Sequence, residues 1–97
     1  MAITIRWSPE ALEDIESIAN YIERDSPNYA KSVVEKIFDK AELLEEFPEL
    51  GRVVPEFNDP VVREIFIYSY RFIYKFSGQE ILVIAVIHGR RMLENYC

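Results

Sequence analysis

The sequence predicts an α+β domain in which an antiparallel helical hairpin lies on one face of a small twisted sheet. Two Ser-Pro pairs, at positions 8–9 and 26–27, each precede a segment whose apolar residues recur at three- and four-residue steps, as in an amphipathic helix. Residues 61–91 then hold most of the β-branched and aromatic residues of the chain, divided into three runs. The predicted order is β-α-α-β-β-β, and the last three strands form an antiparallel meander.

The first predicted elements are a short strand over residues 2–7 and a helix over residues 9–24. Apolar and polar residues alternate in AITIRW, which indicates the strand. Ser8 is a favourable N-cap, and Pro9 is tolerated at the first helical position. The apolar stripe of this helix comprises Leu12, Ile15, Ile18, Ala19 and Ile22.

The second predicted helix covers residues 27–47 and ends before Pro48, with Ser26 as its N-cap. Only two or three residues separate the two helices, so they should pack as an antiparallel hairpin. The segment from Pro48 to Pro60 contains three prolines and a glycine and is predicted to be a loop. The second stripe comprises Ala30, Val33, Val34, Ile37, Ala41, Leu44 and Phe47.

Three strands are predicted over residues 62–67, 70–76 and 80–87. Gly78 lies between the last two and is free to adopt a positive φ, which indicates a hairpin turn. The turn at Tyr68 and Ser69 has no Gly, Asn or Pro to explain it. The last run is almost wholly apolar, as expected for an inner strand.

Alternation divides the strand over residues 70–76 into two faces. Its aromatic row of Tyr70, Phe72, Tyr74 and Phe76 is expected to belong to the core and not to a platform for stacking nucleobases. Arg71 projects from the opposite face.

The chain has 97 residues and a net charge of −6, and we expect one domain over residues 1–97. Residues 1–50 carry five Lys/Arg against twelve Asp/Glu, net −7, and residues 51–97 carry six against five, net +1. Bulk charge therefore excludes a general polyanion binder, and any phosphate contact would depend on a local arginine cluster.

Several absences limit the class of protein. No apolar run has the length of a membrane span. The first residues show no basic stretch followed by an apolar core, so a signal peptide is not expected. The single cysteine, Cys97, is the last residue, which fits a reducing compartment, so a cytoplasmic location is expected. No set of His, Cys, Asp and Glu has metal-ligand spacing, and no glycine-rich phosphate loop is present, so neither a metal nor a cofactor is expected.

The candidate functional residues are the arginines of the C-terminal half, Arg63, Arg71, Arg90 and Arg91. In a meander they could converge on one side of the sheet, where their planar guanidinium groups would bind phosphate or carboxylate. The structural alternative is that they pair with the many acidic residues of the hairpin. His88 and Tyr96 are candidates for proton transfer, although a histidine at a strand end is more often structural.

Five short segments occur in a specific order over nearly the whole chain: WSPEALEDIESIANYI at 7–22, FPELGR at 47–52, VRE at 62–64, YRFIY at 70–74 and VIHGRR at 86–91. Together they resemble the RelE/ParE superfamily of bacterial toxins, the plasmid stabilisation proteins of type II toxin–antitoxin systems. The resemblance implies the same fold, and a cognate antitoxin, usually a small DNA-binding repressor, that wraps and neutralises the toxin in a hetero-oligomer.

The superfamily divides by target, and the resemblance leaves both branches open. RelE-like members are endoribonucleases that cut messenger RNA on the ribosome, whereas ParE-like members inhibit DNA gyrase and are not enzymes. For RNA cleavage, Arg71, Arg91 and Tyr96 match the expected catalytic positions, and Arg91 or Arg90 follows the last strand. In the gyrase reading, Arg63, Arg71, Arg90 and Arg91 bind the target or the antitoxin.

The ParE-like reading is favoured, because the paired lysines of the RelE-like strand are missing and the net charge is acidic. A third reading is a non-toxic interaction module. In either toxin reading, replacing Arg71 or Arg91 with alanine should reduce toxicity without unfolding the domain.

Overall fold

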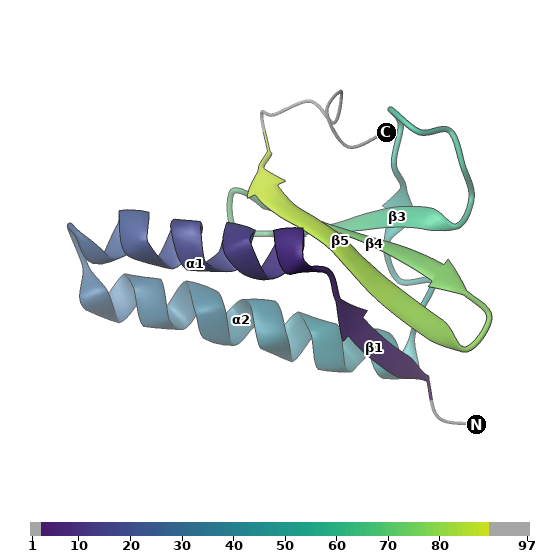
Figure 1. The fold of residues 1–97 in the computed structure, drawn as a ribbon, viewed down its shortest axis with the longest axis horizontal. Coiled ribbons are helices and arrows are strands. Elements are labelled where there is room, and N and C mark those ends of the chain that lie inside the picture. Colours follow the sequence, from purple (N-terminus) through teal and green to yellow (C-terminus); the bar gives the residue numbers. More distant parts are fainter. Residues whose placement is uncertain (1–2, 90–97) are drawn as a thin grey trace.

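The computed structural model describes residues 3–89, which form two helices and a five-stranded sheet (Figure 1). The sheet order is β1-β5-β4-β3-β2, with β1 parallel to β5 and every other pair antiparallel. The helices lie side by side against one face of the sheet, which confirms the predicted α+β architecture. The elements are β1 (Thr4–Trp7), α1 (Pro9–Glu23), α2 (Pro27–Glu46), β2 (Arg52–Val53), β3 (Val62–Ile67), β4 (Tyr70–Ser77) and β5 (Glu80–His88).

The predicted helices and long strands are confirmed to within a residue or two, but the prediction of an unstructured loop from Pro48 to Pro60 is wrong in one part. Within it, Arg52 and Val53 form β2, which pairs with Glu64 and Arg63 of β3. A strand of two residues has no alternation that a sequence pattern could reveal. This short strand matters because it brings Arg52 beside the side chain of Glu64.

Both helices begin where the Ser-Pro pairs predicted. The hydroxyl oxygen of Ser8 accepts a hydrogen bond from the amide of Ala11 at 3.0 Å, and that of Ser26 accepts one from the amide of Tyr29 at 3.1 Å. Each cap satisfies one of the amides that the first turn of a helix leaves without a partner. The following proline has no amide to lose there.

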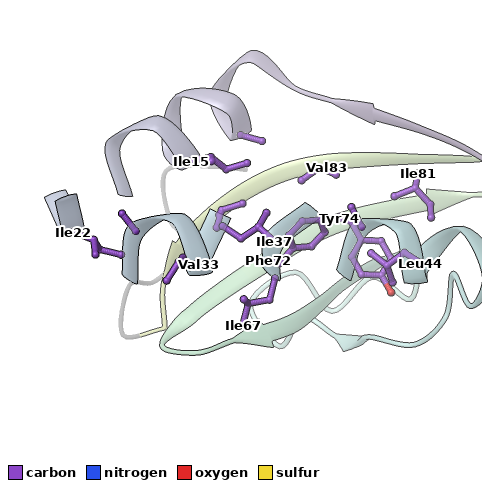
Figure 2. Packing of buried hydrophobic residues seen from close by; sticks show 14 residues of the cluster. Ile15, Ile22, Val33, Ile37, Leu44, Ile67, Phe72, Tyr74, Ile81 and Val83 are labelled. Atoms are coloured by element: carbon purple, nitrogen blue, oxygen red, sulfur yellow. The ribbon is translucent and has the colours of Figure 1, made fainter. Parts of the chain in front are cut away.

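The main core fills the space between the helices and the sheet (Figure 2). The aromatic row of β4 points into it: Phe72 and Tyr74 are fully buried and lie beneath Ile37 and Leu44 of α2, which confirms the row as core. Leu12 and Phe47, two large residues of the predicted stripes, lie outside this core. Leu12 is 49% exposed, because Ala11 takes the buried position, and Phe47 is 55% exposed beyond the end of α2.

A β-bulge in β5 reverses the alternation of its side chains. Ile73 of β4 lies opposite Ala85, but the next residue, Tyr74, lies opposite Val83, so Ile84 is an extra residue. Before the bulge Val83 faces the helices; after it Val86 does so, and Ala85 faces away. The bulge also determines on which side His88 lies at the end of the strand.

Side chains of the first helix satisfy the backbone groups around this bulge. The hydroxyl of Ser8 donates to the carbonyl of Ile84 at 3.0 Å, and the carboxylate of Asp14 accepts the amide of Val86 at 3.0 Å. These bonds join the start of the chain to its last strand, because buried backbone groups that lose their ladder partner need another one.

A second, smaller core covers part of the opposite side of the sheet, which we call the open face. Val54 and Phe57, from the segment between β2 and β3, pack over Val62, Ile73 and Ala85. This segment therefore lies against the open face and brings Glu56 with it.

The hydroxyl of Tyr74 secures the chain where it leaves α2. It accepts the amide of Gly51 at 2.9 Å and donates to the carbonyl of Pro48 at 2.8 Å. Burial raises the pKa of Tyr74 above its ordinary value of 10.0, and the bond from Gly51 and the charge of Arg63 offset this only in part. The FPELGR segment is thus held from within the core.

Replacing Tyr74 with phenylalanine is expected to cost about 1–3 kcal/mol of stability, because the two backbone groups at Gly51 and Pro48 lose a buried partner. The loss should depend on pH. The raised pKa means that the unfolded chain releases this proton first, so the contribution of Tyr74 to stability is constant below about pH 10 and is lost above it. Urea unfolding at about pH 8 and about pH 11 should therefore show a smaller alkaline loss in Y74F than in wild type. Equal losses would contradict the role of Tyr74.

Candidate functional site

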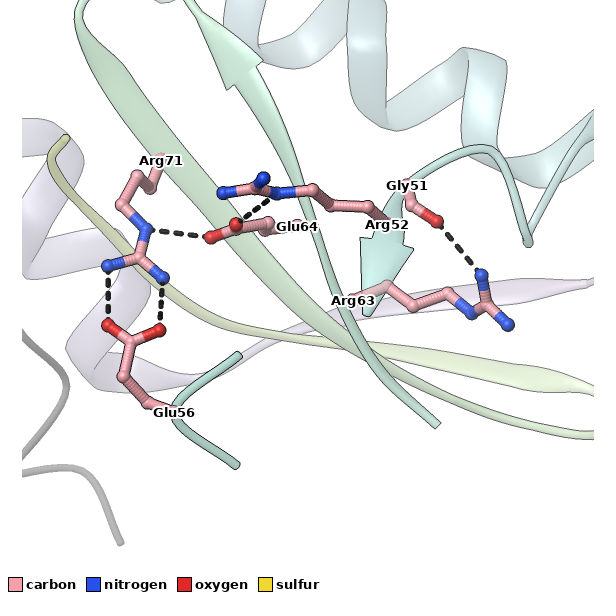
Figure 3. Close-up of polar contacts among 6 residues, drawn as sticks. All are labelled: Gly51, Arg52, Glu56, Arg63, Glu64 and Arg71. Carbon is pink, nitrogen blue, oxygen red and sulfur yellow. Dashed lines mark hydrogen bonds and ion pairs between the residues drawn. The ribbon is translucent and has the colours of Figure 1, made fainter. Parts of the chain in front are cut away.

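Arg71, the arginine of the YRFIY segment, lies at the centre of an ion-pair network on the open face (Figure 3). Its Nε donates to Glu64 at 2.7 Å, while Nη1 and Nη2 each donate to one oxygen of Glu56 at 2.8 Å. Glu64 in turn accepts the Nε of Arg52 at 2.7 Å from β2. Two arginines therefore neutralise two glutamates within this network.

The network is buried at its centre. Arg71 is 5% exposed and Glu64 is 1% exposed. The hydrogen bond to Glu56 raises the pKa of Arg71 further above its usual range, with Glu64 adding to the effect against the cost of burial. Among residues 3–89, no buried side-chain nitrogen or oxygen is without a hydrogen-bond partner. A bidentate carboxylate already takes the outer edge of this guanidinium, where a phosphate would otherwise bind.

Arg63 does not join Arg71, so the expectation that the arginines converge on one side of the sheet is wrong for this pair. Arg63 lies opposite Tyr74, on the side that faces the helices, where it donates to the carbonyl of Gly51 at 2.9 Å. Its Nη2 also lies 3.7 Å from a carboxylate oxygen of Glu49. The alternation of β3 separates Arg63 from Glu64 by one residue and therefore by the thickness of the sheet.

The acidic partners also differ from the structural alternative, which paired these arginines with the helical hairpin. Arg71 and Arg52 bind Glu56 and Glu64, which come from the segment before β3 and from β3 itself. The hairpin cannot supply them, because it covers the other face of the sheet. Arg90, Arg91 and Tyr96 lie outside the described residues.

A second surface lies beside the helical hairpin, where β4 begins and β5 ends. Two adjoining hollows of about 380 and 370 Å³ occur here and share Tyr21, Tyr70 and His88. The first also reaches Asp14, and the second also reaches Asp25, Ser26 and Tyr29. We call these two hollows, together with the adjacent ring of Tyr68, the tyrosine groove.

Aromatic contacts organise this groove. The rings of Tyr29 and Tyr68 meet edge to face with 5.8 Å between centroids, and those of Tyr70 and His88 do so at 5.9 Å. His88 is exposed at the end of β5. Burial, followed by the neighbouring Tyr29 and Tyr21, raises the pKa of Tyr70 above its ordinary value of 10.0.

Sequence reasoning missed Glu56, Glu64 and the tyrosine groove. Alternation along β3 could have indicated Glu64. It is two residues before Phe66, which pairs with Arg71, so Glu64 and Arg71 share a face of the sheet. Glu56 had no such signal, because its position depends on the loop packing of Val54 and Phe57. Within residues 3–89 no cluster of three or more His, Cys, Asp or Glu could hold a metal ion, and neither α1 nor α2 is long and apolar enough to cross a membrane.

Comparison with known proteins places this geometry in a family. Residues 5–93 match the family described as ParE toxin of type II toxin-antitoxin system, parDE. The chain is also similar to a protein of Sinorhizobium fredii (strain NBRC 101917 / NGR234) named "Putative toxin Y4kP". The two are 30% identical over 90 residues, which are 90% of this chain and 88% of the other.

Three solved structures share the fold at low sequence identity. A chain of the chromosomal ParDE system from P. aeruginosa gives a TM-score of 0.71 at 20% identity, covering 89% of this chain and 95% of that one. A chain of the RelBE2 toxin–antitoxin complex of Mycobacterium tuberculosis gives a TM-score of 0.60 at 18% identity, covering 91% of this chain and 99% of that one. A chain of the YoeB dimer of Staphylococcus aureus gives a TM-score of 0.64 at 18% identity, covering 89% of this chain and 95% of that one.

Proposed function

The chain belongs to the ParE toxin family of type II toxin–antitoxin systems, and from this membership we propose that it inhibits DNA gyrase and is neutralised by a cognate antitoxin. A match over residues 5–93 includes every described helix and strand except the first residue of β1. The proposed target follows the ParE-like branch that the sequence favours.

The observation that carries the choice of target is the state of Arg71. A nuclease that attacks through the ribose 2′-hydroxyl must stabilise the charge that develops on the phosphate, and Arg71 is the residue that matches this role. Here its donors are directed at Glu56 and Glu64 at 2.7–2.8 Å. A phosphate would have to displace a bidentate carboxylate and bind beside a second, buried one, which is electrostatically unfavourable.

The distribution of charge supports the same choice. A ribosome-directed nuclease gains affinity from many cationic contacts with phosphate. The net charge of the chain is −6, and Glu56 and Glu64 neutralise Arg52 and Arg71. Binding to a protein target does not require a phosphate-binding surface.

The antitoxin follows from the family and from the systems named among the similar structures, ParDE and RelBE2. Three exposed tyrosines, Tyr21, Tyr29 and Tyr68, also leave apolar area that a bound partner would cover. A partner that binds only the folded chain would raise its melting temperature.

The deciding experiment pairs an assay on the purified chain with an assay in cells that express it. In a gyrase supercoiling assay we expect loss of supercoiling and trapped gyrase–DNA complexes. Primer extension on a reporter transcript after induction should show intact messenger RNA while replication stops. Chain premixed with its cognate antitoxin is the control and should leave gyrase active.

Cuts positioned within codons, together with unaffected supercoiling, would overturn the proposal in favour of a ribosome-dependent endoribonuclease. Neither effect, in cells that grow normally when the chain is expressed alone, would instead indicate the non-toxic interaction module.

A further inference from the structure

The tyrosine groove combines exposed aromatic rings with two hollows. Tyr21 is 69% exposed, Tyr29 is 46% exposed and Tyr68 is 51% exposed. Tyrosine is enriched at the centres of protein interfaces, because it offers a large rigid surface with a polar end. Three such rings around adjoining hollows make this a candidate binding surface.

The backbone of Tyr68 gives a second, independent observation. Tyr68 has a φ of 55°, in the left-handed region that a bulky residue rarely adopts. Glycine is the usual residue in such a turn, and a non-glycine residue there costs about 1–2 kcal/mol. The chain nevertheless holds an exposed tyrosine at this position, with its ring against Tyr29. Non-glycine residues in this strained conformation are found preferentially at binding sites and active sites.

The charge around the groove defines the chemistry of a partner. Asp14 lines one hollow and Asp25 lines the other. The hairpin that forms one wall, residues 9–46, carries eleven Asp/Glu against four Lys/Arg, net −7. Carboxylates next to tyrosine faces attract guanidinium and ammonium groups, both by ion pairing and by cation–π contact.

We propose that the tyrosine groove is the docking surface for a cationic segment of the antitoxin, whose Arg or Lys side chains enter the two hollows while its apolar residues cover Tyr21, Tyr29 and Tyr68. This inference rests on the proposed function for the existence of the antitoxin. It adds the surface and the chemistry of the segment that binds.

The same charges argue against other occupants. Nucleic acid and anionic lipid would both be repelled by Asp14 and Asp25 in the hollows and by the net charge of −7 on the hairpin. A second copy of this chain would bring the same acidic hairpin against the groove. Among macromolecules, a protein segment with positive charge therefore fits the groove best.

The first test replaces Tyr68 with glycine and measures the affinity for the cognate antitoxin, purified from the adjacent gene, by calorimetry. Glycine relieves the left-handed backbone, so the melting temperature should be kept or raised. Loss of the ring should nevertheless weaken antitoxin binding by about tenfold. Tyr21→Ala, on the exposed side of α1, should do the same. Phe66→Ala is the matched control, because Phe66 is also 51% exposed but lies on the open face, and its affinity should be unchanged.

The second test reverses charge. Asp25→Lys should weaken antitoxin binding by about tenfold at low salt, with a smaller difference at high salt, because it puts a cation where the partner's cation binds. Asp39→Lys makes the same change in net charge about 20 Å further along α2 and should leave the affinity unchanged.

Unchanged antitoxin affinity in Tyr68→Gly, Tyr21→Ala and Asp25→Lys would overturn the inference while leaving the antitoxin itself established. Loss of gyrase inhibition with full antitoxin binding would also overturn it, because the groove would then contact the target. If the wild-type chain bound no antitoxin and had no effect on gyrase, the proposed function would fail first.

Discussion

Replacing Glu64 with alanine should lower the free energy of unfolding by roughly 3–5 kcal/mol, the usual cost of leaving one partner of a buried ion pair uncompensated. Glu64 is 1% exposed and accepts one hydrogen bond each from Arg71 and Arg52 at 2.7 Å. The variant keeps Arg71 buried with Glu56 alone. Because a small domain has only about 5–15 kcal/mol of stability in total, this loss should show as a large fall in the midpoint of urea unfolding.

Glu49→Ala is the matched control for this prediction. It also removes one carboxylate near an arginine, but the Glu49 side chain is 72% exposed and lies 3.7 Å from Arg63, so its loss should cost no more than about 1 kcal/mol. Equal midpoints for the two variants would show that the Arg71 network does not stabilise the fold. The same geometry revises an earlier expectation: Arg71→Ala should now destabilise the domain, so reduced toxicity in that variant alone would not identify a binding residue.

Replacing Gly51 with alanine should be the next most damaging single change. A Cβ at this position would lie 2.6 Å from the backbone oxygen of Glu64 and 2.8 Å from the hydroxyl of Tyr74, closer than carbon and oxygen can approach. Overpacking costs roughly 1–3 kcal/mol, and displacing the hydroxyl from the Gly51 amide adds a lost buried hydrogen bond of about 1–3 kcal/mol. Thermal unfolding should report a melting temperature well below that of wild type.

Gly78→Ala provides the comparison, because its Cβ meets nothing within 4 Å and only its φ of 73° opposes the change. That strain is about 1–2 kcal/mol. The double variant Gly51→Ala/Tyr74→Phe should cost less than the sum of its single changes, since removing the hydroxyl relieves part of the clash. Strict additivity would mean that the two sites do not contact each other in solution.

The fold could be predicted largely because local signals and long-range packing agree. The serine caps, most of the helical stripes and the positive φ of Gly78 are determined by neighbouring residues, and these are confirmed. The bulge at Ile84 could not be predicted, because Ile84 is apolar like the residues on either side of it. The hydroxyl that bonds its carbonyl belongs to Ser8, 76 residues away. Leu12 and Ala11 differ by one position on α1, and only the shape of the core decides which is buried.

The candidate site could be predicted less well, for a physical reason. Sequence pattern identifies Arg71 as a residue placed to bind an anion, but it does not show which anion is nearest. Glu56 reaches Arg71 only because Val54 and Phe57 pack on the open face, a contact between segments with no shared periodicity. The tyrosines were assigned to their elements correctly, yet Tyr21, Tyr29 and Tyr68 come from three segments that only the tertiary fold brings together.

The parallel pairing of β1 with β5 has a consequence for the time at which the toxin becomes complete. Thr4 pairs with Glu80, so the first strand cannot pair until a segment 76 residues later has been synthesised. At translation rates of about 5–20 residues per second, that interval lasts roughly 4–15 s. The helical hairpin, whose contacts are local, can form during this time, but the sheet that carries Arg71 cannot close until nearly the whole chain has left the ribosome. A cell that makes the antitoxin first thus has seconds in which each new toxin chain is still harmless.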